Sequence, residues 1–172
     1  MSYADKIIVA AKSYVGQQEI QPNKGFQDPS FETKMRARGW EPPQPWCGYF
    51  AKQCWVDAYA DNADFLATVK KLSNGGALTT LADWKASEPQ QVGHIPVPGA
   101  LVIFEEGNGP NGHVGIVISV QGNIYATIEG NTNTDGSRDG YEVAQKTHDI
   151  TRPFNPNGLN LVAFIHPLEF NN

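Results

Sequence analysis

The chain has 172 residues, 40% of them hydrophobic and 18% charged, and its formal net charge at pH 7 is -5. This length suits one domain built around one hydrophobic core, so we expect residues 1–172 to form a single domain. A nucleic-acid-binding protein needs a basic face to neutralise phosphates, and the negative net charge argues against one. Its apolar runs are too short to cross a bilayer, which excludes an integral membrane protein.

The first half of the chain has the periodicity of helices. Apolar residues recur at helical spacing, which predicts helices over residues 3–15, 31–38, 48–59, 63–72 and 78–85. Three prolines at positions 42, 43 and 45 force an extended approach to Cys47, and the pattern of a buried helix begins directly after it. Cys47 is therefore expected at a helix N-terminus.

From residue 97 onward the sequence changes to short β runs separated by turns. The predicted strands cover residues 100–104, 113–120, 124–129, 141–146 and 159–166. Helices followed by strands indicate an α+β fold. A run of neighbouring strands favours an antiparallel sheet with the N-terminal helices packed on one face.

The apolar pattern predicts the register of the central hairpin. If the apolar residues of both strands share one face, Val120 lies opposite Ile124 and Ile116 lies opposite Ile128. The hairpin loop is then a three-residue loop over residues 121–123, which is a common type.

Continued to the base of the hairpin, this register places Gly115 opposite Glu129 and His113 opposite Asn131. These side chains then project from the face opposite the apolar one. A histidine with a carboxylate diagonally beside it is the base and the orienting group of a catalytic triad. A two-residue loop would instead place Glu129 on the apolar face, which is costly for a carboxylate.

Cys47 supplies a nucleophile for this pair. The dipole and free N–H groups of a helix N-terminus favour a thiolate, and the same N–H groups stabilise an oxyanion. Cys54 lies seven residues further along the same helix, about 10 Å away by helical rise, which is too far for a disulfide. We expect two free thiols, with Cys54 buried in the core.

Four short motifs in this order resemble those of one enzyme family. They are PWCGYF at residues 45–50, PGALVIF at 98–104, GHVGIV at 112–117 and IEGNT at 128–132. Together they are similar to the motifs of CHAP domains, the cysteine- and histidine-dependent amidohydrolases/peptidases. The resemblance extends from about Tyr3 to the C-terminus.

This resemblance implies a papain-like α+β fold and a catalytic domain that covers residues 1–172. The cysteine, histidine, glutamate and asparagine of the family match Cys47, His113, Glu129 and Asn131. It also implies hydrolysis of peptidoglycan by an N-acetylmuramoyl-L-alanine amidase or by a stem or cross-bridge endopeptidase. Such bacteriolytic domains occur in phage endolysins, autolysins and secreted antibacterial effectors.

Two other functions stay open. The same three side chains serve any amide, so a papain-like protease or deamidase that acts on protein substrates is one alternative. An inactive module that keeps the fold and binds cell-wall peptides is the other. The intact set of Cys47, His113 and Glu129 argues against an inactive module.

The remaining candidate residues are assigned more briefly. Trp46 lies beside the nucleophile in the sequence, so we expect it to contact substrate. Residues 135–140 begin like a calcium loop, but Lys146 occupies the position of the bidentate glutamate, so we interpret the segment as a turn. We expect no metal and no cofactor. Outside the hairpin, the histidines lack ligand spacing and are interpreted as structural or exposed: His94, His148 and His166.

The N-terminus does not have the pattern of a signal peptide, because its apolar stretch is brief and lies between Asp5 and Lys12. We therefore expect synthesis in the cytoplasm and action on the cell wall after release or secretion. The expected partner is peptidoglycan, with an immunity protein in addition if the protein is an effector. We expect a monomer.

Overall fold

The helices of the computed structural model lie in the first half of the chain, and the structure describes residues 1–134 and 140–169. They are α1 (Tyr3–Ser13), α2 (Pro29–Ala37), α3 (Cys47–Ala58), α4 (Ala63–Leu72), α5 (Ala77–Ser87) and the short 3-10 helix η1 (Pro89–Gln91). Ser2, Asp28 and Asn62 cap α1, α2 and α4 by accepting hydrogen bonds from backbone N–H groups. The predicted helices are confirmed, with small differences at their ends.

The second half of the chain forms a six-stranded antiparallel sheet in the order β3-β8-β4-β5-β6-β7. Its strands are β3 (Val92–Gly93), β4 (Leu101–Glu106), β5 (Gly112–Gln121), β6 (Ile124–Thr132), β7 (Glu142–Asp149) and β8 (Leu159–Ile165). A separate hairpin joins β1 (Glu19–Ile20) to β2 (Gly25–Phe26). The α+β prediction is confirmed. The three two-residue strands were not predicted, because so short a strand carries no periodicity.

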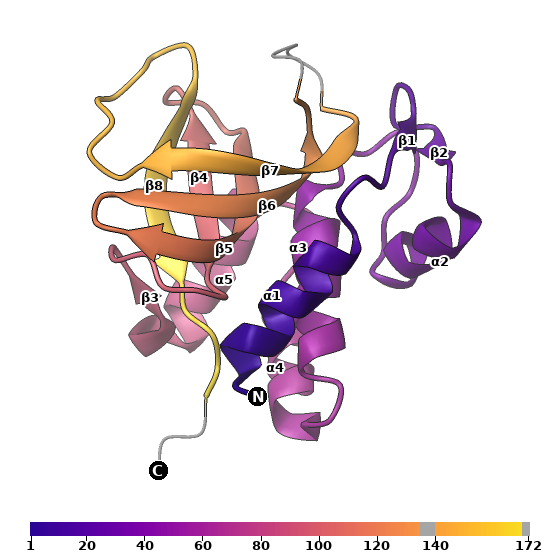
Figure 1. Ribbon diagram of the computed structural model, residues 1–172, viewed down its shortest axis with the longest axis horizontal. Helices are drawn as coiled ribbons and strands as arrows, with labels where there is room; N and C mark the ends of the chain where they lie inside the picture. The colour runs from indigo at the N-terminus through magenta and orange to yellow at the C-terminus, as the bar shows by residue number, and fades with distance from the viewer. Residues whose placement is uncertain (135–139, 170–172) are drawn as a thin grey trace.

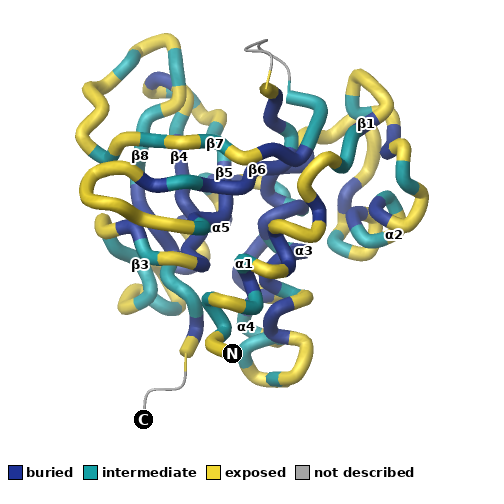
Figure 2. The backbone as a smooth tube through the Cα atoms, viewed as in Figure 1, coloured by how far each residue is buried: buried dark blue, intermediate teal, exposed yellow. Residues whose placement is uncertain are grey.

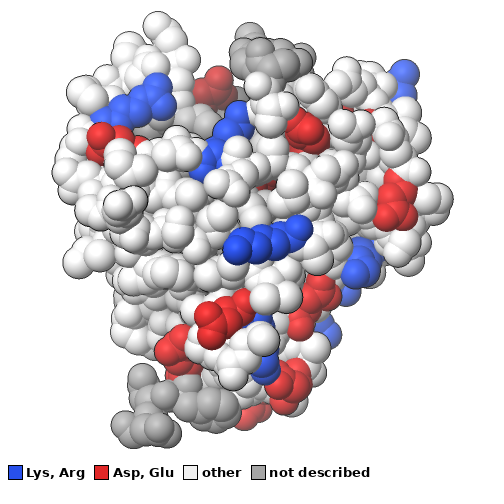
Figure 3. Space-filling model, viewed as in Figure 1, with Lys and Arg blue, Asp and Glu red and all other residues white. Residues whose placement is uncertain are grey.

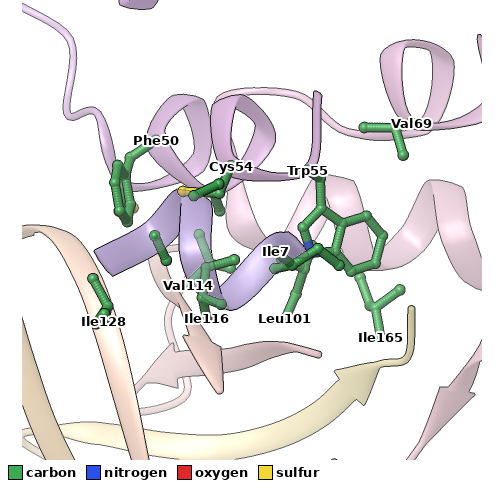
Figure 4. Close-up of a cluster of buried hydrophobic side chains, with 14 of the residues drawn as sticks. Ile7, Phe50, Cys54, Trp55, Val69, Leu101, Val114, Ile116, Ile128 and Ile165 are labelled. Atoms are coloured by element: carbon green, nitrogen blue, oxygen red, sulfur yellow. The ribbon is translucent and has the colours of Figure 1, made fainter. Parts of the chain in front are cut away.

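The helices cover one face of the sheet (Figure 1). Helix α3 packs on β5 and β6 and against α1, and α5 packs on β4 and β5. The apolar side chains of the strands on this face join one large core with the helices, where Trp55 and Cys54 are both completely buried. Figure 4 shows Cys54 and Trp55 above Val114 and Ile116 of β5. Residues 48–59 have the sequence pattern of a buried helix because α3 packs against both the sheet and α1.

The opposite face of the curled sheet holds a second, smaller apolar cluster. Its members are Ala100, Val102, Phe104, Val117, Tyr125 and Phe164. The central strands are therefore buried on both faces, as the dark segments of β5 and β6 show in Figure 2. His113 and Glu129 alternate with the helix-facing residues of β5 and β6, so they belong to this second face.

The tip of the central hairpin corrects the predicted register. Gln121 lies opposite Ile124, so the loop has two residues and not three, and Gly122 takes the left-handed conformation with φ 60°. A register shift between Val117 and Ser119 then restores the predicted pair of Ile116 with Ile128.

The physical reason for this error is the solvent exposure of the tip. Val120 and Ile124 are 37% and 43% exposed, so no apolar face fixes the register there. The bulge around Ile118 absorbs the one-residue difference. A two-residue loop is therefore compatible with Glu129 on the face opposite the helices, although the apolar pattern alone argues against that combination.

The surface carries charges of both signs. On the face drawn in Figure 3, basic and acidic side chains are interspersed and do not gather into a patch of one sign. Within residues 1–134 and 140–169, none of the helices has the length and apolarity needed to span a bilayer.

Candidate active site

Cys47 is the first residue of α3. Trp46 at the N-cap makes no side-chain capping hydrogen bond, and the first helical hydrogen bond runs from the Phe50 N–H to the Trp46 carbonyl. The N–H groups of the first turn therefore have no partner within the helix. The N–H of Gly48 in this turn and the N–H of Val114 on β5 are directed at the Cys47 sulfur, and they stabilise negative charge on it.

His113 lies near the start of β5 and faces both Cys47 and Glu129. Its Nε2 is 2.8 Å from the Glu129 Oε2, and its side chain is 12% exposed. The thiol of Cys47 also hydrogen bonds to the imidazole of His113. Because Nε2 is occupied by Glu129, this hydrogen bond involves Nδ1. The three side chains therefore form one chain of contacts from sulfur to carboxylate.

Glu129 is a buried carboxylate whose charge is well compensated. It is 2% exposed, and burial alone would raise its pKa, but hydrogen bonds from His113 and His148 hold the pKa well below its ordinary value. Thr127 donates a further hydrogen bond of 2.6 Å to Oε1. Gly115 leaves the room for this side chain, because a Cβ there would lie 2.7 Å from the Glu129 Cγ.

The protonation states follow from the ionised carboxylate. An ionised carboxylate only accepts hydrogen bonds, so Nε2 of His113 carries a proton and Nδ1 is free to take one from the thiol. Burial opposes charge on the ring, but the contacts with Cys47 and Glu129 outweigh it and raise the pKa of His113. Burial likewise opposes the thiolate, and the contact with His113 outweighs it and lowers the pKa of Cys47. The pair therefore favours a thiolate beside an imidazolium.

These side chains lie at the base of an open cleft of about 1530 Å³. One wall comes from the β1–β2 hairpin and the segment before α3, and includes Glu19, Asn23 and Gln44. The other wall comes from the loops before α5 and β5 and from the segment after β7. Cys47 is only 6% exposed, so a substrate reaches its sulfur through this cleft.

Asn131 lines the same cleft but is not one of the three side chains that connect the sulfur to the carboxylate. It takes a left-handed conformation with φ 54°, and the pairing of β6 with β7 shifts register between Glu129 and Thr132. Glu129 is the residue that binds Nε2 of His113. A catalytic role of Asn131 stays a prediction.

Trp46 is not placed to contact a substrate, which corrects the prediction from its position beside Cys47. The side chain is 0% exposed, and its Nε1 donates a 2.7 Å hydrogen bond to Glu19. Its ring packs edge-on against Phe26 and Phe50. Consecutive residues at a helix start point in different directions, so Cys47 faces the cleft while Trp46 faces the core.

His148 was missed as part of the site, because it was interpreted as structural or exposed. It lies on β7, and its Nε2 is 2.7 Å from the Glu129 Oε1. The pairing of Tyr125 with His148 places it on the same face as Glu129. The alternation along β7 was a usable signal, but the long connection from β6 left the register of β7 without a constraint.

The segment that resembles a calcium loop in sequence, residues 135–140, lies mostly outside the residues that the structure describes. Of the turn predicted over residues 135–140, only Gly140 belongs to the described residues. Among residues 1–134 and 140–169, no group of three His, Cys, Asp or Glu side chains is arranged to hold a metal ion. Cys47 and Cys54 are both free thiols, as predicted.

A cysteine at a helix start that meets a histidine and a glutamate of a curled antiparallel sheet, in a cleft, is consistent with a papain-like thiol hydrolase. A model of the CHAP domain matches residues 39–131, more than half of the chain. The chain therefore belongs to the CHAP domain family, whose members are generally cysteine-dependent hydrolases. Neither a curated protein nor a solved structure matches the chain.

Proposed function

We propose that this protein is a peptidoglycan hydrolase that cleaves an amide bond by thiol catalysis. The observation that supports this most strongly is the chain of contacts from Cys47 through His113 to Glu129 in an open cleft. Membership of the CHAP domain family supports the substrate class.

In the proposed reaction the thiolate of Cys47 attacks the carbonyl carbon of the amide, and the carbonyl oxygen becomes an oxyanion. The free N–H groups at the start of α3 are available to stabilise that charge. The imidazolium of His113 gives its proton to the leaving nitrogen, which departs as an amine. A thioester then links Cys47 to the acyl group.

Water completes the cycle. Neutral His113 takes a proton from the water, the hydroxide adds to the thioester carbonyl, and the thiolate leaves with a free carboxylic acid as product. Glu129 holds the ring and stabilises its protonated form in both steps. No step requires an oxidant, a reductant or a metal ion.

The test is digestion of purified peptidoglycan, followed by mass spectrometry of the released fragments, with Cys47→Ala as the control. New N-terminal alanine with free lactyl groups identifies an amidase, and cleavage within the stem peptide or cross-bridge identifies an endopeptidase. Hydrolysis of a protein substrate with intact peptidoglycan would favour the protease alternative. Binding to peptidoglycan without release of fragments would favour the inactive module.

The biological setting belongs to the same proposal. A lysis enzyme and an antibacterial effector both need this activity, and both reach the wall after release or secretion. An effector also requires an immunity protein in the cell that makes it. Co-purification from the producing cell, compared with the protein purified alone, distinguishes the effector from the lysis enzyme, and the same sample shows whether the protein is monomeric.

A further inference from the structure

Glu129 accepts hydrogen bonds from two histidines, and only one of them contacts the nucleophile. His113 binds Oε2 at 2.8 Å, whereas His148 binds Oε1 at 2.7 Å together with the hydroxyl of Thr127. The carboxylate is thus held at both oxygens by three donors. We propose that His148 is a positioning residue, which fixes Glu129 in the orientation that His113 needs.

The ring of His148 is itself held in place by aromatic side chains. Its centroid lies 4.9 Å from the ring of Phe104 and 5.3 Å from the ring of Tyr125, which stacks on it at 25°. Phe104 and Tyr125 both belong to the second apolar cluster. The donor is therefore rigid, because rotating its ring would break the stacking with Tyr125.

The tautomer of His148 follows from the same geometry. Glu129 is ionised and only accepts, so the Nε2 of His148 must carry a proton. The Nε2–H of His148 and the hydroxyl of Thr127 then both donate to Oε1 of Glu129.

Removing the N–H donor of His148 should destabilise protonated His113, because Glu129 is then held less firmly. With only Thr127 left on Oε1, the carboxylate is held less firmly and aligns less well with the Nε2 of His113. The imidazolium is then less stable, and the thiolate that depends on it forms at higher pH. Among the described residues, the titratable groups that face Glu129 are His113 of β5, Tyr125 of β6 and His148 of β7, and Cys47 of α3 faces His113.

This inference rests on the proposed function for its catalytic meaning, but its first readout needs no substrate. The rate at which iodoacetamide alkylates Cys47 is measured from pH 4 to pH 9 in wild type, His148→Phe and His148→Gln. Phenylalanine keeps the aromatic stacking but has no donor, whereas the amide of glutamine places an N–H close to the position of Nε2. The matched control is His166→Phe, because His166 bonds to the Ile95 carbonyl and does not line the cleft.

We expect His148→Phe to shift the acidic limb of the alkylation profile to higher pH and to lower kcat on peptidoglycan by about tenfold or more, with KM little changed. His148→Gln should remain within a few-fold of wild type in both measurements. The control His166→Phe should behave as the wild type does. Superimposed profiles of wild type and His148→Phe would overturn the proposal.

A measurement that leaves His148 unchanged covers the case in which His148→Phe does not fold. The ¹⁵N spectrum of the imidazoles in wild type should show His148 protonated at Nε2, with a signal that moves in Glu129→Gln. A ring protonated only at Nδ1 would overturn the proposal. If the wild type leaves peptidoglycan intact, the proposed function fails, while the spectrum and the alkylation profiles still decide the role of His148.

Discussion

Cys47 and Cys54 belong to the same helix but have opposite chemical environments. Cys47 begins α3 at the base of the cleft, where His113 and two backbone N–H groups outweigh burial and lower its pKa. Cys54 lies within the core, where burial and then the charge of Asp57 raise its pKa. Two turns of helix therefore separate a nucleophile from a small apolar core residue.

The difference shows that the neighbours of a thiol decide its reactivity. Both side chains are buried, and burial opposes the thiolate at both positions. Only Cys47 has a histidine that becomes a cation beside it. The two cysteines therefore differ because Cys47 stands at the start of α3 beside His113 of β5, whereas Cys54 stands in the middle of α3 within the apolar core.

The largest effect on activity is expected from replacing Cys47, the reactive member of the pair of cysteines. Cys47→Ala removes the only proposed nucleophile and should lower peptidoglycan hydrolysis by at least about a thousandfold. The fold should be retained, because the substitution removes one sulfur atom at the start of α3, beside the cleft. Fragment release and circular dichroism of the variant check both statements. Digestion at the wild-type rate would disprove the assignment of Cys47.

The next effect removes the charge that supports His113. Glu129→Gln keeps the shape of the side chain, but its amide cannot accept from both histidines as a carboxylate does, so kcat should fall by roughly 10²- to 10⁴-fold. The alkylation rate of Cys47 near pH 6 should fall too, because the imidazolium is less stable. Glu106→Gln serves as a matched control, since Glu106 lines the cleft but is exposed. Equal turnover in the wild type and Glu129→Gln would show that Glu129 has no such role.

A direct measurement sharpens the comparison. Because the pKa of Cys47 is lowered, its alkylation by iodoacetamide should begin to fall at a lower pH than that of an ordinary thiol, which loses about tenfold per pH unit below its pKa of about 8.5. Cys54 should stay unmodified up to pH 8, since its pKa is raised and it is 0% exposed. We expect a rate ratio on the order of a hundredfold or more at pH 6.5, read by mass spectrometry of each cysteine peptide. Faster labelling of Cys54 would reverse the assignment.

Much of this contrast was available from the sequence. The prolines before Cys47 and the apolar period after it predicted the helix start, and the structure confirms α3 from Cys47 to Ala58. The alternation in β5 and β6 predicted the pair of Ile116 with Ile128, because apolar packing fixes the register at the buried base of the hairpin.

The failures share a physical cause, which is the absence of a local constraint. At the exposed hairpin tip, the left-handed Gly122 permits a tighter turn and a bulge absorbs the extra residue. His148 reaches Glu129 through a strand pairing that no short loop specifies. Trp46 points into the core because of the rotation of one residue at a helix start, which periodicity alone does not resolve.

The smallest expected effect tests the other side of the comparison. Cys54 is completely buried among apolar side chains such as Phe50, Val114 and Ile116 (Figure 4). Cys54→Ala removes only the sulfur atom, so the loss of contacts and the small cavity should lower the free energy of unfolding by about 1 kcal/mol. Activity should remain near the wild-type level, because the cavity lies two turns from the cleft. Urea denaturation gives the stability change, and fragment release gives the activity.

Cys54→Ser should lower stability further, since its hydroxyl would be buried without an assured hydrogen-bond partner. If Cys54→Ala instead lost activity while keeping its stability, the thiol of Cys54 would have a chemical role, and the division of α3 into a reactive end and an inert middle would be wrong.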